Sequence, residues 1–291
     1  VPTTAIGTDA FQEAPVAAIM GAVAKHVFLV TDAEKLEETM RSAFELARTG
    51  RPGPVVVDIP KDIQNWNGPF KGAGTLPLHG YRRRLAKVEE NVLSDGACER
   101  FYTLLSESDR PLIYAGGGVI NANAAKAMRR FANEYGIPVT TTLMALGASN
   151  TQHPLALHML GMHGVASANY AVEDCDFLIT MGARFDDRVA GNPGQFAPRA
   201  KNIAHFDVDF AEIGKVKRVN WHHVGLLERD LTDLLAYGRR IGFAKEFKEW
   251  HDEIAHLKEE YCLNYDRDST LIQPYAVIEE INRHSKGEAI I

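Results

Sequence analysis

Residues 112–142 read LIYAGGGVINANAAKAMRRFANEYGIPVTTT, and this stretch decides the fold class. An apolar run ends at three glycines, and a second run rich in Val and Thr follows Gly136. Between them, apolar residues recur at helical spacing, at Ala125, Met128, Phe131 and Ala132. The pattern predicts a strand at 112–115, a helix ended by Gly136 and a strand at 138–142, which together form a βαβ unit.

The chain on either side repeats this alternation. Ala97, Phe101, Leu104 and Leu105 predict a helix before the first strand, and apolar runs at 177–181 and 203–206 predict two further strands. Strands that alternate with helices are joined by crossover connections, and such connections link parallel strands. The sequence therefore predicts an α/β fold with a doubly wound, mainly parallel sheet.

The chain divides into five sections, 1–66, 67–90, 91–238, 239–264 and 265–291, of which 91–238 holds this sheet. Section 67–90 is punctuated by proline and glycine and shows no periodic apolar pattern, so we expect a linker, with Arg82–Arg84 as solvated residues. Section 239–264 is expected to be a helical linker. Section 265–291 is expected to begin a further, truncated domain with a helix from Pro274.

The first section carries signals for one helix and one strand. Thr31–Glu34 has the pattern of a capping box, and Gly50 stands where a helix ends in a left-handed residue. The β-branched run at 55–59 predicts a strand buried on both faces, as in parallel sheets. One apolar stripe is predicted for the helix, at Leu36, Met40, Ala43, Phe44 and Ala47.

Composition excludes several classes of protein. The formal net charge is −6, so we expect no nucleic-acid partner, and no apolar run approaches the ~20 residues that span a membrane. Cys98, Cys175 and Cys262 are far apart and form no CxxC pair, so we expect neither a metal site nor a disulfide framework. The chain lacks an initial Met and stops within an apolar run, and we expect both ends to be cut from a longer protein.

Chemistry-bearing residues follow several of the predicted strands, where open α/β sheets bind ligands. Gly116–Gly118 permit close backbone approach and are expected to offer outward amides to a diphosphate, although a glycine triplet also serves as a tight turn. Arg184, Asp186, Asp187 and Arg188 lie within five residues, where we expect limited solvent. They suit phosphate recognition or, equally, a structural ion-pair network.

Two more motifs occupy comparable positions. Met159–His163 joins flexible thioethers to glycine and histidine, which suits either a flat ring or plain core packing. Asp207 closes a strand, where an acidic residue binds ribose hydroxyls or caps a helix. Four such motifs at one sheet edge favour a large, nucleotide-like cofactor.

Eight motifs in order along the chain resemble acetolactate synthase (acetohydroxyacid synthase) catalytic subunits, which are thiamine-diphosphate enzymes. RFDDR, MLGMHG and RPGPVVVDIPKD together are specific to that family. The motifs are IGTDAFQE (6–13), KH (25–26), GRPGPVVVDIPKD (50–62), AGGGVIN (115–121), TTLMALG (141–147), HMLGMHG (158–164), GARFDDRV (182–189) and HFDVDFAEIGK (205–215).

The resemblance implies a layout and a flavin site. Section 1–66 corresponds to the end of the pyrimidine-binding domain, 91–238 to a Rossmann-like FAD-binding central domain, and 265–291 to the start of the diphosphate-binding domain. The positions that match FAD contacts are Arg51, Gly116, Gly117, Gly118, Thr142, Leu143, Met144, Met159, Leu160, Gly161, Met162, His163, Gly182, Arg184, Asp186, Arg188, Val189 and Asp207.

The resemblance also implies a substrate channel lined by Phe11, Gln12 and Lys61. A herbicide-binding mouth would be formed by Pro2, Ala10, Lys61, Asp187 and Arg188. The full-length enzyme would condense pyruvate with a second 2-ketoacid, using thiamine diphosphate and Mg²⁺. The activating glutamate is expected before residue 1 and the GDG motif that holds Mg²⁺ after residue 291, so we expect the chain alone to bind FAD and to be inactive.

The implied partners are a second copy in a homodimer or homotetramer and a regulatory small subunit, in bacterial cytoplasm or in a plastid or mitochondrion. Two alternatives stay open: another thiamine-diphosphate enzyme, of pyruvate oxidase or glyoxylate carboligase type, and a stand-alone flavin- or nucleotide-binding module. The sequence departs from the family pattern after Lys215, where Arg229-Asp230 stand in place of a small residue and Asp. A flavin contact by Asp230 is therefore an open question.

Overall fold

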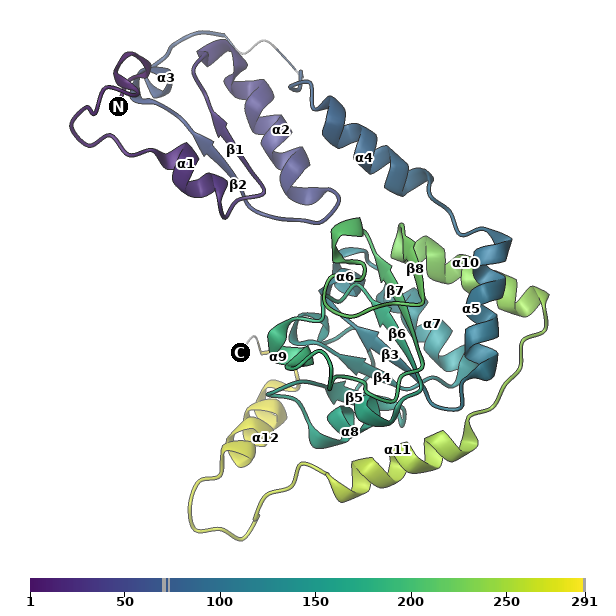
Figure 1. Ribbon diagram of the computed structural model, residues 1–291. Coiled ribbons are helices and arrows are strands. Elements are labelled where there is room, and N and C mark those ends of the chain that lie inside the picture. Colours follow the sequence, from purple (N-terminus) through teal and green to yellow (C-terminus); the bar gives the residue numbers. More distant parts are fainter. Residues whose placement is uncertain (70–71, 73, 290–291) are drawn as a thin grey trace.

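The computed structural model describes residues 1–69, 72 and 74–289, which form a small first unit and a larger central domain joined by a long helix (Figure 1). The first unit holds two parallel strands, β1 (His26–Leu29) and β2 (Val55–Asp58). Around them lie η1 (Thr3–Ala5), α1 (Val16–Gly21), η2 (Ala33–Lys35), α2 (Leu36–Arg48) and α3 (Lys61–Gln64).

The helix predicted in the first section is present, with two corrections. Asp32, and not Thr31, caps the 3₁₀ helix η2 that leads into α2, since its carboxylate accepts a hydrogen bond from the Glu34 amide at 3.0 Å. Gly50 lies beyond the helix end with φ 58°, as predicted. The predicted apolar stripe is wrong in part, because the buried face of α2 is Thr39, Ser42, Ala43 and Leu46.

Because the buried face of α2 is rotated away from the predicted stripe, Phe44 is 63% exposed and Met40 is exposed as well. Every residue of β2 is only half-buried, so the prediction of a strand buried on both faces is also wrong. Within the described residues this sheet has only two strands, so each of them is an edge strand.

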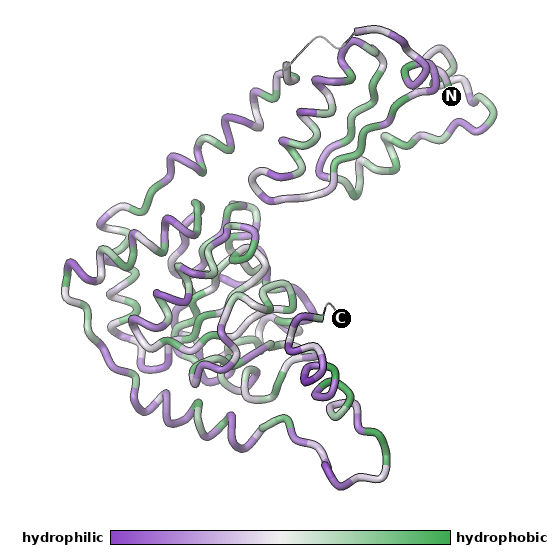
Figure 2. Tube along the Cα trace, turned by 180° about the vertical axis from the view of Figure 1, so that it is seen from behind, coloured by the Kyte–Doolittle hydropathy of each residue, from purple (hydrophilic) through white to green (hydrophobic). Residues whose placement is uncertain are grey.

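The stretch expected to be an irregular linker contains α4 (His79–Glu90), a helix of mostly hydrophilic residues (Figure 2). Tyr81, Leu85 and Val88 recur at helical spacing along its half-buried side, a signal overlooked between the flanking prolines and glycines. Arg82 is not simply solvated, because Nε and Nη2 donate to the Glu45 carboxylate at 2.8 and 2.7 Å.

The central domain is built on six parallel strands in the order β5-β4-β3-β6-β7-β8, the order of dinucleotide-binding α/β sheets. The predicted doubly wound parallel sheet is confirmed. Its strands are β3 (Pro111–Ala115), β4 (Val139–Thr141), β5 (Ala156–Met159), β6 (Phe177–Met181), β7 (Asn202–Asp207) and β8 (Trp221–Val224). The two edge strands β5 and β8 were not predicted, because they are short and contain histidine instead of an apolar run.

Helices cover this sheet and bury its two central strands completely. They are α5 (Asp95–Glu107), α7 (Ala125–Tyr135), α8 (Ala166–Asp174), α10 (Leu227–Arg240) and α11 (Lys248–Glu260). Ser94 caps α5 by accepting from the Ala97 amide at 3.2 Å, and Gly136 ends α7 with φ 62°, as predicted. Phe101 packs edge-on against Phe131 and Trp221, so one aromatic cluster ties helices to strands.

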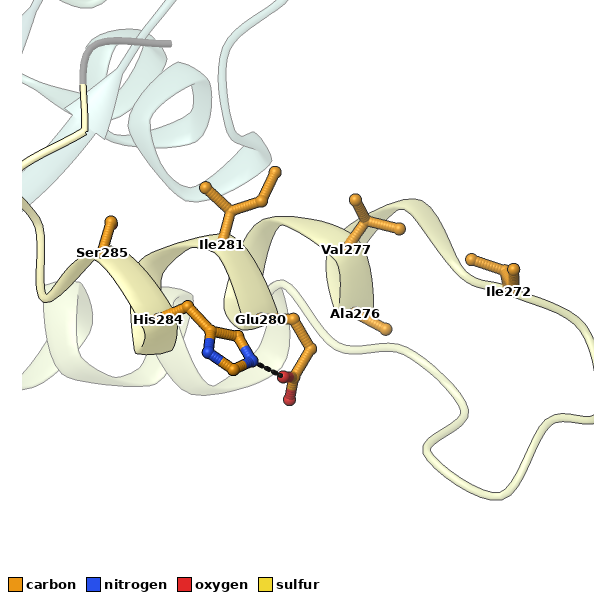
Figure 3. A pocket seen from close by; sticks show the side chains of 7 residues that line it. All are labelled: Ile272, Ala276, Val277, Glu280, Ile281, His284 and Ser285. Carbon is orange, nitrogen blue, oxygen red and sulfur yellow. Dashed lines mark ion pairs between the residues drawn. The ribbon is translucent and has the colours of Figure 1, made fainter.

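Short elements line the loops after the strands, namely η3 (Leu143–Ala145), α6 (Gly117–Asn121), α9 (Asp187–Ala190) and η4 (Phe210–Glu212). The last helix, α12 (Pro274–Ser285), begins at the predicted proline. Its apolar side, with Val277 and Ile281, stays exposed (Figure 3). Of the helices in the described part of the chain, none has the length and apolar character to cross a membrane.

Candidate functional site

The loops that follow strands β3 to β7 gather at one edge of the central sheet, because parallel strands end on the same side (Figure 1). This placement was predicted from the strand-end motifs. The residues that the sheet brings to this edge are Gly116–Gly118, Thr142–Met144, Met159–His163, Gly182, Arg184, Asp186, Arg188, Val189 and Asp207.

The glycine triplet brings the loops after β3 and β6 into contact. A Cβ atom on Gly116 would lie 2.2 Å from the Gly182 carbonyl oxygen, and one on Gly118 would lie 2.6 Å from the Gly182 Cα. The Gly116 amide donates to Met181 O at 2.9 Å, and the Gly118 amide donates to Gly182 O at 3.0 Å. These two amides are therefore not free for a diphosphate, and the predicted outward cradle is wrong for them.

The loop at 159–164 is fastened to the loop at 184–189. The Met162 amide donates to Arg188 O at 2.9 Å, and a Cβ atom on Gly161, whose φ is 95°, would lie 2.8 Å from that same oxygen. The Asn169 side chain accepts from the Gly161 amide at 2.8 Å and donates to its carbonyl at 3.1 Å. Asn169 was not among the predicted site residues, because nothing in its local sequence marks this contact.

Phe185 anchors the arginine-rich loop. It has a left-handed φ of 56° and is 2% exposed, with its ring 5.5 Å from Tyr114 and 5.4 Å from His205. Phe185 points inward, and Arg184 directly before it points outward with its side chain 57% exposed. The side chain of Arg188, on α9, is 71% exposed. The expectation that solvent is limited there is wrong for both arginines.

The ion pairs of this loop are weak enough to leave both guanidinium groups open to a ligand. Arg184 Nη2 lies 3.4 Å from Asp186 Oδ2, and Arg188 Nε lies 4.0 Å from Asp187 Oδ2. Exposed pairs of this kind contribute roughly 0–1 kcal/mol. The other Asp186 oxygen accepts from the Arg188 amide at 3.1 Å and so caps α9.

An apolar surface lies beside these arginines. Leu143, Met144 and Met162 are 65%, 73% and 65% exposed, and Arg188 Nη1 lies 3.9 Å from the Met162 sulfur. Leu160, by contrast, is plain core. The hydroxyl of Thr142 is buried and has no hydrogen-bond partner among the described residues. Exposed thioethers, nearby guanidinium groups and an unpaired hydroxyl suit a ligand that joins a flat ring to phosphate.

The two aspartates considered at strand ends differ in position. Asp207 closes β7, and its carboxylate accepts from the Asp209 amide at 2.9 Å and lies 3.6 Å from His205 Nε2. Asp230 is only 1% exposed within α10, with Oδ1 3.3 Å from His223 Nε2. Burial raises the pKa of Asp230. Its carboxylate lies beside His223 of β8 and Arg229 of α10.

Arg51 reaches the same edge from the first unit. Its Nη1 lies 3.4 Å from Asp209 Oδ2 and also pairs with Glu212, which is 4% exposed. Partial burial acts to lower the pKa of Arg51, but the hydrogen bonds to these carboxylates outweigh it and raise the pKa. The contact places a predicted cofactor residue next to the turn that begins at Asp207.

The residues expected to line a substrate channel stand apart from this edge. Phe11 is 90% exposed, Gln12 has φ 64°, and Lys61 is exposed at the start of α3. Pro2 and Ala10 belong to the same unit, whereas Asp187 and Arg188 lie on α9. The helices α3 and α9 are well separated (Figure 1), so the structure does not bring the predicted herbicide-binding residues together within one copy of the chain.

The described part of the chain contains no group of three or more His, Cys, Asp or Glu side chains placed to hold a metal ion. Cys98 and Cys175 are buried and Cys262 is exposed. Burial raises the pKa of the Cys98 thiol to about 11, which keeps it protonated and unreactive at neutral pH.

Comparison with known proteins gives one family and a consistent set of relatives. The family model for the central domain of thiamine pyrophosphate enzymes matches residues 98–234, which hold all six strands of the central sheet. This is the part of the chain in which the candidate site lies.

The relatives resemble the whole chain. Acetolactate synthase 1, chloroplastic, of Zea mays is 43% identical over 100% of this chain and 45% of its own length. The acetolactate synthase large subunit of Corynebacterium glutamicum is 42% identical over 98% of this chain and 45% of its own. Acetolactate synthase, chloroplastic, of Arabidopsis thaliana is 40% identical over 100% of this chain and 43% of its own length. The chain thus spans less than half the length of the relatives it matches.

Proposed function

This chain belongs to the acetolactate synthase family of thiamine-diphosphate enzymes, and we propose from this premise that its central domain binds FAD at the carboxyl edge of the six-stranded sheet. The observation that carries the proposal is that Met144, Met162, Arg184 and Arg188 are all exposed on loops at that edge, with Arg188 Nη1 3.9 Å from the Met162 sulfur. Thioethers pack well on a flat ring, and guanidinium groups bind phosphate oxygens.

Different residues of the site would bind different parts of the cofactor. Arg184 and Arg188 would bind the diphosphate, and Leu143, Met144 and Met162 would cover the ring. The unpaired Thr142 hydroxyl would gain a hydrogen-bond partner. Asp207, at the end of β7, would accept hydrogen bonds from ribose hydroxyls, as acidic residues at strand ends do. Arg51 would contribute a further positive charge from the first unit.

For the full-length protein we propose condensation of pyruvate with pyruvate or 2-ketobutyrate, with loss of CO₂, in branched-chain amino acid biosynthesis. Thiamine diphosphate with Mg²⁺ would supply the electron sink for that decarboxylation. A second copy of the chain would join Pro2, Ala10 and Lys61 of one subunit to Asp187 and Arg188 of the other. We also propose that the full-length protein binds a regulatory small subunit. Its location would be the bacterial cytoplasm, a plastid or a mitochondrion.

Replacing Arg184 with alanine is expected to weaken FAD binding by about 10- to 100-fold. A hydrogen bond to a charged group contributes roughly 1.5–3 kcal/mol, and about 1.4 kcal/mol corresponds to a factor of ten. Titration of the chain followed by flavin fluorescence measures the affinity. Arg130→Ala is the matched control, since Arg130 is an exposed arginine on α7. Equal loss in both variants would refute the site.

The chain by itself is expected to form no acetolactate from pyruvate, even with thiamine diphosphate, Mg²⁺ and FAD added. Its 291 residues contain no GDG motif for the metal and diphosphate. Colorimetric detection of acetoin after acid decarboxylation of the product measures the reaction. Turnover by the chain alone at a rate typical of enzymes, about 10 s⁻¹, would show that the missing thiamine-binding residues have substitutes within it.

A further inference from the structure

We propose that α4 is a rigid strut that positions Arg51 at the cofactor site, and that Arg229 and His223 are positioning residues that clamp its carboxyl end to the central domain. The inference deepens the proposed function, because it concerns the geometry of the same FAD site. It also gives a role to the Arg229-Asp230 pair, whose role the sequence left open.

Arg229 binds the last carbonyl groups of α4. Its Nη1 donates to Glu89 O at 2.5 Å, and its Nη2 donates to Asn91 O at 2.7 Å. Carbonyls at the end of a helix have no partner within the helix and carry partial negative charge. A guanidinium group satisfies two of them at once with charge-assisted hydrogen bonds, so Arg229 fixes both the position and the direction of α4.

His223 and Asp230 support the contact between Arg229 and the end of α4 from the side of the central domain. His223 Nε2 lies 3.2 Å from Asn91 O and 3.3 Å from Asp230 Oδ1, and the Asn91 side chain donates to Val224 O at 2.9 Å. The side chains of His223 and Asp230 are 8% and 1% exposed. Arg229 Nε lies 3.9 Å from the buried Asp230 carboxylate, so the guanidinium is held between that charge and the helix end.

The other end of α4 is bound to the first unit. Arg82 pairs with Glu45 of α2 through two hydrogen bonds. The Tyr81 hydroxyl donates to Thr49 O at 2.8 Å, and Lys25 Nζ donates to that oxygen at 2.7 Å and to the Tyr81 hydroxyl at 3.0 Å. Thr49 is two residues before Arg51, so these hydrogen bonds attach α4 to the turn that carries this arginine.

The contacts form a closed path from the central domain through α4 and Thr49 to Arg51, and back through its ion pairs with Asp209 and Glu212. The Arg51 side chain is 43% exposed, whereas that of its partner Glu212 is 3% exposed, so these pairs attach the first unit to the central domain at one point. One point of attachment does not fix the orientation of the first unit, and the α4 contacts add a second point. Without Arg229, the first unit should move relative to the sheet and carry Arg51 away from the cofactor site.

The first test measures the placement of the first unit. Nitroxide labels at Arg48→Cys and Asn133→Cys, in a Cys262→Ser background, report the distance between α2 and α7 by pulsed electron paramagnetic resonance. We expect one narrow distance distribution in the parent, a broad one in Arg229→Ala and an intermediate one in Arg229→Lys. Arg83→Ala, at an exposed arginine of α4, should match the parent. A parent-like distribution in Arg229→Ala would overturn the proposal.

The second test measures FAD affinity in a double-mutant cycle. Arg229→Ala should weaken binding about 10-fold in the parent and have no further effect in an Arg51→Ala background, because it acts through Arg51. Losses that add in the double variant would show that Arg229 does not act through Arg51. If the parent binds no FAD, the proposed cofactor site fails, while the label distances still decide whether α4 is a strut.

Discussion

Replacing Phe185 with alanine is expected to lower the free energy of unfolding of the central domain by about 3–5 kcal/mol, the usual cost of removing a buried phenylalanine. The ring is 2% exposed and packs against Tyr114, Phe196 and His205, so its loss leaves a cavity beneath the arginine-rich loop. Arg184 and Asp186 flank this residue, and FAD affinity should therefore fall together with stability.

Urea denaturation followed by tryptophan fluorescence measures this change, since Trp221 and Trp250 are both buried in the central domain. Phe44→Ala is the matched control, because Phe44 is 63% exposed on α2 and its removal should change the free energy of unfolding by less than about 0.5 kcal/mol. Equal effects at the two positions would mean that Phe185 does not anchor the loop.

The second large effect is expected for Gly116→Ala, which should destabilise the central domain by about 3 kcal/mol or more. The added Cβ would lie 2.2 Å from Gly182 O and 2.6 Å from Ala183 Cα. Both are backbone atoms of the neighbouring loop, which can give way only if the whole loop after β6 moves. That loop carries Arg184, so FAD binding should be lost as well.

Gly96→Ala is the same chemical change, but it is expected to raise the free energy of unfolding. Gly96 lies within α5, and a Cβ there would meet only the end of Arg100 at 3.9 Å. Alanine is favoured over glycine inside a helix by roughly 0.5–1 kcal/mol. Urea denaturation should therefore place Gly116→Ala below the parent and Gly96→Ala above it. A Gly116→Ala variant as stable as the parent would show that the loops do not need their close approach.

The parallel sheet could be predicted from the sequence because its central strands are continuous apolar runs, each bounded by glycine or a polar turn. Burial on both faces imposes that pattern. The edge strands β5 and β8 are partly exposed and therefore tolerate His158 and His222, which hides them from a search for apolar runs. Helix α4 was missed for a similar reason, since its stripe of Tyr81, Leu85 and Val88 is only half-buried and lies among arginines.

The candidate site was predictable as a set of strand ends but not as a surface. Its residues stand directly after strands, so parallel topology alone places them at one edge. The role of Gly116 and Gly118 depends on Gly182, more than 60 residues away, and the outward turn of Arg184 depends on the buried ring of Phe185. Contacts of that range leave no local pattern, and the predicted cradle and limited solvent were wrong for this reason.

A crystal structure of the chain grown with FAD would show directly whether the central domain carries the cofactor. We expect density for FAD at the carboxyl edge of the central sheet, with the diphosphate at Arg184 or Arg188 and the flavin ring against Met144 or Met162. FAD bound elsewhere on the chain, or an empty edge in crystals grown at a saturating FAD concentration, would contradict this expectation.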